Sequence, residues 1–187
     1  MKNYQITNWI HHFLEEHVQP GDICIDATMG NGNDTVLLSK LAGESGRVIA
    51  FDIQQMALEH TKERMEKEDC PENYELILAS HETMNGYAQE NTVSCITFNL
   101  GYLPGGDHTK ATKGESSIRA IETGLCLLKK KGLMTVCIYS GGDSGFDEKE
   151  AVLSYVRNLD SKKYLVIMTE YVNRPNNPPI PVLIIKL

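Results

Sequence analysis

The chain has 187 residues, of which 41% are hydrophobic and 23% are charged, and its formal net charge is −7 at pH 7. This length fits a single domain over residues 1–187, and the composition is typical of a soluble globular protein rather than a disordered or membrane-embedded one. An acidic body argues against a protein coated in basic surface for non-specific nucleic-acid binding, but it leaves room for a local cationic patch that recognises RNA.

The first 20 residues contain a predicted amphipathic helix, over residues 1–18. Its apolar residues recur at helical spacing, while histidines and glutamates interrupt any signal-peptide core. No apolar stretch of the chain approaches the roughly 18–20 residues that cross a bilayer. We therefore expect a cytoplasmic protein with no membrane partner. The apolar positions of this helix are Ile6, Trp9, Ile10, Phe13 and Leu14.

Apolar, β-rich runs alternate with helical patterns along the rest of the chain. The runs occupy residues 23–28, 47–52, 74–79, 94–99, 133–140, 164–172 and 182–187. Helical patterns are expected between the first five runs and ahead of the sixth, with clear cases at 34–41, 54–68, 115–128 and 146–159. This alternation predicts βαβ units and a parallel sheet covered by helices on both faces.

Only a turn-forming segment, residues 173–181, separates the last two runs. Without a helix between them, these strands pair antiparallel if they are adjacent. The predicted fold is therefore α/β and Rossmann-like, with a seven-stranded, mostly parallel sheet and a C-terminal antiparallel hairpin. This is the outline of the class I methyltransferase sheet. Simple nucleotide-binding Rossmann domains lack the final hairpin.

The five cysteines show neither a CxxC pair nor a spacing suited to zinc. Four of them lie in apolar runs, where a free cysteine behaves as a small hydrophobe. We therefore expect unreactive core thiols, a reducing compartment and no metal site. The cysteines are Cys24, Cys70, Cys95, Cys126 and Cys137.

The strongest local feature is the turn after the first run, Asp-Ala-Thr-Met-Gly-Asn-Gly-Asn at residues 26–33. Gly30 and Gly32 let the backbone turn sharply and pass close to a ligand. The helix that follows offers free N–H groups and its positive dipole end. Asp52 ends the second run, where a carboxylate can accept both hydroxyls of a ribose. The pattern predicts a nucleoside cofactor.

Two details favour S-adenosylmethionine over NAD. The dinucleotide fingerprint has a third glycine where this chain has Thr35, and Asp26 precedes the glycines at the end of the strand. S-adenosylmethionine carries an α-ammonium and no phosphate, so only this ligand gives a nearby acid a partner. Gln54 and His81 are expected on the adenine side. The alternatives are NAD, a turn that uses glycine for geometry alone, and a solvated surface His81.

A candidate reaction site follows the fourth run. The Asn99 amide oxygen and the carbonyl after it can hold an amine by its N–H bonds and aim its lone pair at a sulfonium methyl. Tyr102 offers an aromatic wall. The segment resembles the Asn-Pro-Pro-Tyr element of amino-methyltransferases, with Leu-Gly in place of Pro-Pro. Asp107 and His108 are candidates to receive the amine proton, a role that solvent can also fill. The alternative is a strand-capping asparagine and a core tyrosine.

Two further segments are expected near the acceptor. Tyr139 and the glycine-rich residues after it end the fifth run at the same edge of the sheet. The loop at 173–179 is polar and stiffened by prolines, and it carries Arg174 and Asn176. Arg174 suits a phosphate or a base edge. A rigid surface loop or a dimer contact is the alternative.

Together these segments resemble the small methyltransferases labelled rRNA methylases in Gram-positive bacteria. The resemblance covers residues 23–187 and keeps every motif in order. It implies transfer from S-adenosylmethionine, without metal, to the 5-aminomethyl group of 5-aminomethyl-2-thiouridine at the wobble position of the tRNA anticodon stem-loop, by a homodimer. The alternatives are an rRNA or small-molecule amine substrate, and a non-catalytic nucleoside sensor. The residues that match the family are Asp26, Thr28, Gly30, Asn31, Gly32, Asn33, Asp52 and Gln54 for the donor, and Asn99, Gly101 and Tyr102 for the reaction site.

Overall fold

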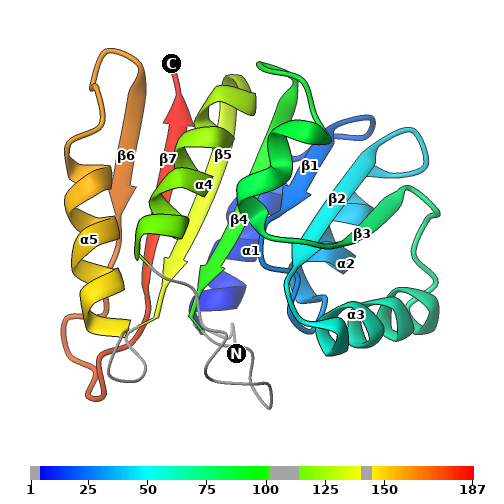
Figure 1. Cartoon of the computed structure of the whole chain (residues 1–187), viewed down its shortest axis with the longest axis horizontal. Helices are drawn as coiled ribbons and strands as arrows, with labels where there is room; N and C mark the ends of the chain where they lie inside the picture. Colours follow the sequence, from blue (N-terminus) through cyan, green and yellow to red (C-terminus); the bar gives the residue numbers. More distant parts are fainter. Residues whose placement is uncertain (1–4, 102–113, 140–144) are drawn as a thin grey trace.

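The computed structural model describes residues 5–101, 114–139 and 145–187. Their strands are β1 (Ile23–Asp26), β2 (Arg47–Asp52), β3 (Tyr74–Leu78), β4 (Val93–Leu100), β5 (Leu128–Ile138), β6 (Tyr164–Met168) and β7 (Ile180–Lys186). They form one seven-stranded sheet in the order β3-β2-β1-β4-β5-β7-β6 (Figure 1). The first five strands in this order pair parallel, and β7 is antiparallel to both of its neighbours, β5 and β6. The predicted class I methyltransferase fold is confirmed.

Helices cover both faces of this sheet. In Figure 1, α4 (Gly114–Leu127) and α5 (Gly145–Arg157) lie in front of the sheet, and α1 (Ile6–His17) and α2 (Asn33–Ala42) lie behind it. One buried cluster joins the sheet to α4 and α5, and a second joins it to α1 and α2. The third helix, α3 (Gln55–Lys67), follows β2. Because β1, β2, β4 and β5 run in the same direction, their carboxyl ends share one edge of the sheet. No helix of the described residues is long and apolar enough to span a membrane.

The structure differs from the expected elements in three places. Only a short 3₁₀ helix, η1 (His81–Gly86), follows β3, where the alternation predicted a helical pattern. β6 ends at Met168 rather than at residue 172, because its ladder with β7 ends at the pair Met168 and Val182; the Thr169 N–H still donates to the Pro181 carbonyl at 3.0 Å. β5 begins at Leu128, directly after α4, because Leu128 already pairs with Val93 of β4.

The cysteines only partly follow the expectation of core thiols. Cys24, Cys95 and Cys137 are buried, and burial raises the pKa of Cys24 and Cys137 to about 12. Cys126 is exposed, because it lies on the outer face of α4. The prediction of a core position was therefore wrong for Cys126, although its neighbours in the sequence are apolar.

Candidate functional site

The turn between β1 and α2 has the backbone geometry that its glycines predict. Gly30 and Gly32 have φ angles of +50° and +77°, in the left-handed region that favours glycine. The Gly30 N–H donates to Asp52 Oδ2 at 3.1 Å, and the Gly32 N–H donates to the Met29 carbonyl at 2.7 Å. Gly32 is also the N-cap of α2. The turn, the start of the helix and the acid of β2 thus form one hydrogen-bonded unit.

Asp26 supports this turn from inside the protein. Its side chain is fully buried and accepts hydrogen bonds from Thr35 Oγ1 at 2.6 Å, the Thr28 N–H at 3.2 Å and Thr97 Oγ1 at 3.3 Å. Burial, with a further contribution from Asp34, raises the pKa of Asp26 well above the usual range of a carboxyl group. Thr35, which stands where a dinucleotide site has glycine, therefore ties the first turn of α2 to the end of β1.

Sequence reasoning missed the support that α3 gives to the same turn. Thr61 Oγ1 donates to the Gly30 carbonyl at 3.1 Å, and His60 Nδ1 lies 3.2 Å from Asn31 Oδ1. Arg64 Nη1 donates to Asn33 Oδ1. The three residues follow the helical spacing i, i+1, i+4, so they share one face of α3. Polar side chains at that spacing after Asp52 were the signal in the sequence.

Gln54 and His81, which the sequence predicts on the adenine side, both contact the end of β2 or the turn after β1. The Gln54 N–H donates to Asp52 Oδ1 at 3.0 Å, so backbone donors orient both oxygens of the Asp52 carboxylate. His81 is buried, its Nδ1 lies 3.2 Å from the Ala27 carbonyl, and its ring packs edge-on against Phe98. Burial lowers the pKa of His81 and so favours the neutral ring. Ile53, between Asp52 and Gln54, is 50% exposed and offers an apolar surface.

The chemistry of this side-chain set fits S-adenosylmethionine better than a pyrophosphate. Asp34 and Asp52 flank the turn, and carboxylates there repel phosphates but attract an ammonium and a sulfonium. The start of α2 suits the carboxylate of the same ligand. Asp52 can accept the ribose hydroxyls. Among the residues that the structure describes, no group of three or more His, Cys, Asp or Glu side chains could hold a metal ion.

Asn99 lies directly beside the turn at residues 26–33, the donor turn, named for the methyl donor. Its backbone N–H donates to Thr28 Oγ1 at 2.7 Å, and its side-chain Nδ2 donates to Asp34 Oδ2 at 2.8 Å. Asp34 is buried in the first turn of α2. Its other oxygen, Oδ1, lies 2.6 Å from His11 Nε2 of α1. The contribution of α1 to this site was not predicted, because His11 is distant in the sequence and its helix was interpreted only by its apolar stripe.

Tyr139 follows β5 at the same edge, as predicted. A Cβ on Gly101, the residue after β4, would lie 3.2 Å from Tyr139 Cβ, so the ends of the two strands are in close contact. Burial raises the pKa of Tyr139 to about 12, while a hydrogen bond with the Thr7 side chain opposes this rise. The predicted residues Tyr102, Asp107 and His108 lie outside the described residues.

Arg174 and Asn176 lie on the connection between β6 and β7, and both are exposed. Asn176 and Asn177 have left-handed φ angles of +66° and +46°, so the chain turns sharply here. β7 begins beside the end of β5, where Ile180 pairs with Ile138. The connection therefore emerges at the sheet edge that carries Asn99, but on the far side of β5.

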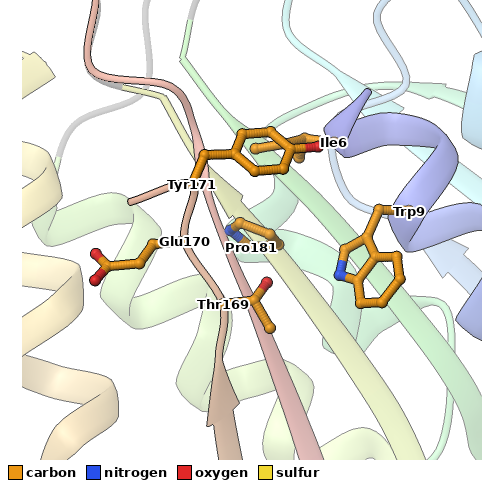
Figure 2. A pocket seen from close by; sticks show the side chains of 6 residues that line it. All are labelled: Ile6, Trp9, Thr169, Glu170, Tyr171 and Pro181. Carbon is orange, nitrogen blue, oxygen red and sulfur yellow. The ribbon is translucent and has the colours of Figure 1, made fainter. Parts of the chain in front are cut away.

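An apolar hollow of about 320 Å³ lies between the start of α1 and the same connection. In Figure 2, the rings of Trp9 and Tyr171 flank it, Pro181 lies at its floor, and the carboxylate of Glu170 points away. None of the residues predicted from the sequence as site residues lines it. Among the described residues, those that line it are Ile6, Trp9, Thr169, Glu170, Tyr171 and Pro181.

Two glycines allow the donor turn to be tested with a matched pair. A Cβ on Gly32 would lie 3.0 Å from Thr61 side-chain atoms, whereas a Cβ on Gly43 (φ +64°) would meet nothing within 4 Å. Both residues have positive φ angles, and Gly43, with ψ −178°, lies in a region that essentially only glycine adopts, so each alanine variant should lose about 1–3 kcal/mol of unfolding free energy. Only Gly32→Ala should also weaken binding of S-adenosylhomocysteine. Urea unfolding and calorimetry measure both quantities; unchanged affinity in Gly32→Ala, or an equal loss of affinity in Gly43→Ala, would contradict this account of the turn.

Comparisons with known proteins agree with this geometry. The family model described as "Putative rRNA methylase" matches residues 48–185. A crystal structure from Clostridium thermocellum, described as a "putative rRNA-methylase", is 41% identical, has a TM-score of 0.95, and covers 100% of both chains. A structure from Streptococcus mutans, described as a "putative methyltransferase" in complex with SAH, is 39% identical, has a TM-score of 0.89, and also covers 100% of both chains.

A relative from Arabidopsis thaliana is named tRNA (mnm(5)s(2)U34)-methyltransferase, chloroplastic. It is 33% identical over 184 residues, which are 92% of this chain and 66% of the relative. The chain thus spans just under two thirds of that protein's length. The family match covers most of the chain, and the fold, the donor turn and the SAH-bound neighbour agree on the cofactor. The chain therefore belongs to the rRNA methylase family and is a class I methyltransferase that uses S-adenosylmethionine.

Proposed function

We propose that this methyltransferase transfers a methyl group to the 5-aminomethyl nitrogen of 5-aminomethyl-2-thiouridine at the wobble position of tRNA. The observation that carries the proposal is the hydrogen bond from Asn99 Nδ2 to Asp34 Oδ2, beside the donor turn. With its N–H₂ group turned to Asp34, Asn99 presents its carbonyl oxygen as an acceptor for a substrate N–H. The name of the Arabidopsis relative supports the wobble nucleoside as the substrate.

The protein's part in this reaction is alignment. S-adenosylmethionine supplies a methyl group already activated on its sulfonium. Asp52 and the turn at Gly30 and Gly32 fix the donor end, and Asn99 accepts an amine N–H so that the nitrogen lone pair points at the methyl carbon. The nitrogen forms the new N–C bond as the C–S bond breaks, and sulfur keeps the electron pair. The acceptor reacts as a free amine, so its ammonium form must first lose a proton, and we assign Asp107 or His108 to receive that proton.

The carboxylates around the turn suit this chemistry in a second way. Positive charge passes from the sulfonium to the acceptor nitrogen during transfer, so charge near the reacting atoms stays positive throughout. Asp34 lies directly behind Asn99, where its negative charge favours a cation at the acceptor position. An acceptor that became anionic would be opposed by the same charge. The site therefore favours an amine over an oxygen acceptor that reacts as its anion.

The partners in this proposal are the anticodon stem-loop of tRNA and a second copy of the chain. The exposed Arg174 and Asn176 offer a cation and an amide to RNA at the reaction edge, with Tyr102 and Tyr139 as aromatic neighbours of the base. Support for a homodimer comes from the edge strand β6, where Leu165 and Ile167 are 46% and 39% exposed. We place the protein in the cytoplasm, where it meets its tRNA.

Matched RNA substrates test the proposed function. Synthetic anticodon stem-loops would carry 5-aminomethyl-2-thiouridine, 5-hydroxymethyl-2-thiouridine or unmodified 2-thiouridine at the wobble position, and S-adenosylmethionine would carry a labelled methyl group. We expect incorporation into the aminomethyl RNA at a rate at least about 100-fold above the other two, because only the amine offers both a lone pair and an N–H to Asn99. Equal labelling of all three RNAs, or labelling of rRNA alone, would contradict the proposal and favour the rRNA alternative.

A further inference from the structure

His11, Asp34 and Asn99 form a hydrogen-bonded chain from three separate elements. His11 Nε2 of α1 lies 2.6 Å from Asp34 Oδ1, and Asn99 Nδ2 of β4 donates to Asp34 Oδ2 at 2.8 Å. The Asp34 side chain is only 7% exposed and that of His11 only 20%, so solvent competes little for these bonds. No general property of the fold requires a histidine of the first helix to contact this acid.

The chemistry of the three groups fixes their orientations. An ionised carboxylate only accepts hydrogen bonds, so both of its partners must present donors. His11 therefore carries its proton on Nε2, and Asn99 must turn its N–H₂ group toward Asp34. Since the two ends of an amide lie on opposite sides, the carbonyl oxygen of Asn99 then faces away from Asp34. The backbone N–H of Asn99 is separately held by Thr28 Oγ1 at 2.7 Å.

We propose that Asp34 and His11 are positioning residues that hold the Asn99 amide with its oxygen toward the acceptor. Asp34 selects the amide orientation and polarises the carbonyl oxygen, and His11 holds Asp34 in the rotamer that reaches Asn99. The role of the oxygen in methyl transfer rests on the proposed function, whereas the orientation of the amide does not. The N-terminal helix thus contributes a side chain to the reaction site.

Variants of adjacent residues separate this role from general stability. His11→Ala removes the support of Asp34, and His12→Ala is its matched control, because His12 is exposed and its Nε2 lies 3.7 Å from Glu16 Oε1 rather than near Asp34. Asp34→Asn is the sharper change. His11 would still donate to the amide oxygen of the new side chain, whose N–H₂ group would then face Asn99 and force the Asn99 amide to flip.

The first measurement is methyl transfer at saturating donor, with S-adenosylhomocysteine affinity measured alongside. We expect kcat to fall about 10-fold in His11→Ala and about 100-fold in Asp34→Asn, the range seen when a residue that orients a functional side chain is lost. His12→Ala should stay within about 2-fold of the wild type, and donor affinity should change far less than kcat in every variant. Unchanged kcat in both His11→Ala and Asp34→Asn would overturn the proposal.

The second measurement needs no RNA, so it distinguishes failure of this proposal from failure of the proposed function. The side-chain amide signals of Asn99, assigned in a ¹⁵N-labelled protein by their loss in Asn99→Ala, should shift in His11→Ala and Asp34→Asn and stay in place in His12→Ala. Unmoved signals in the first two variants would show that Asp34 does not fix the amide, whatever the substrate is. If the wild type transfers no methyl group to the aminomethyl RNA, the substrate is wrong, and these signals alone still decide whether Asp34 orients Asn99.

Discussion

Asp52→Ala is expected to weaken S-adenosylhomocysteine binding by about 2–3 kcal/mol, or about 30- to 150-fold in Kd. The loss has two sources. The carboxylate no longer accepts the ribose hydroxyls, and the Gly30 and Gln54 N–H groups that it orients at 3.1 and 3.0 Å lose their acceptor. Isothermal titration calorimetry with S-adenosylhomocysteine measures the change directly.

Glu59→Ala is the control for this variant, because Glu59 is an acid of the neighbouring helix α3 that contacts only Gln55 among the hydrogen bonds described. Its affinity should stay within about 2-fold of the wild type, since exposed pairs contribute little. Thermal unfolding of both variants checks that they are folded at the titration temperature. If Asp52→Ala bound S-adenosylhomocysteine as tightly as the wild type, Asp52 would not be a ligand of the ribose.

Asn99→Ala is expected to leave donor binding within about 3-fold of the wild type while reducing kcat about 100-fold, equivalent to ~2–3 kcal/mol in the barrier. The backbone N–H of residue 99 still donates to Thr28, so the donor turn keeps its shape. The amine, however, loses the acceptor that directs its lone pair. Single-turnover methyl transfer to the aminomethyl stem-loop, at saturating donor, isolates this effect from binding.

Asn158→Ala is the matched control for this asparagine. Asn158 is exposed after α5, and its amide donates only to the Ser154 carbonyl among the described bonds, so its loss should leave kcat unchanged. A parallel loss of donor affinity and kcat in Asn99→Ala would mean that Asn99 belongs to the donor site rather than the acceptor site. An unchanged kcat would remove it from the mechanism.

The sequence predicted the parts of the fold that depend on local patterns. Alternating apolar runs and helices gave the order of the elements, and the missing helix before β7 gave the antiparallel pair. The prediction of a helix between β3 and β4 was wrong. Residues 81–86 form a short 3₁₀ helix instead, and its buried residues are His81 and Met84. The predicted end of β6 was also wrong, because the pairing of β6 with β7 decides where that strand ends.

The donor turn could be predicted because its two glycines lie close together in the sequence, and the acid that ends β2 follows them at the spacing typical of nucleoside sites. The supports of the turn could not. His11, Thr61 and Arg64 reach the turn from helices that approach it only in the folded chain. Nothing local to His11 distinguishes it from His12, and only the position of α2 decides that one faces Asp34 and the other faces solvent.

The position of the transferred methyl group tests the central claim most directly. After reaction of the aminomethyl stem-loop with S-adenosylmethionine, digestion to nucleosides and fragmentation mass spectrometry would locate the added mass within the wobble nucleoside. We predict that it lies on the exocyclic nitrogen of the C5 substituent, where Asn99 would hold the amine. A methyl group on the ribose or on the uracil ring would contradict the claim, because neither position offers an amine to the oxygen that Asp34 turns outward.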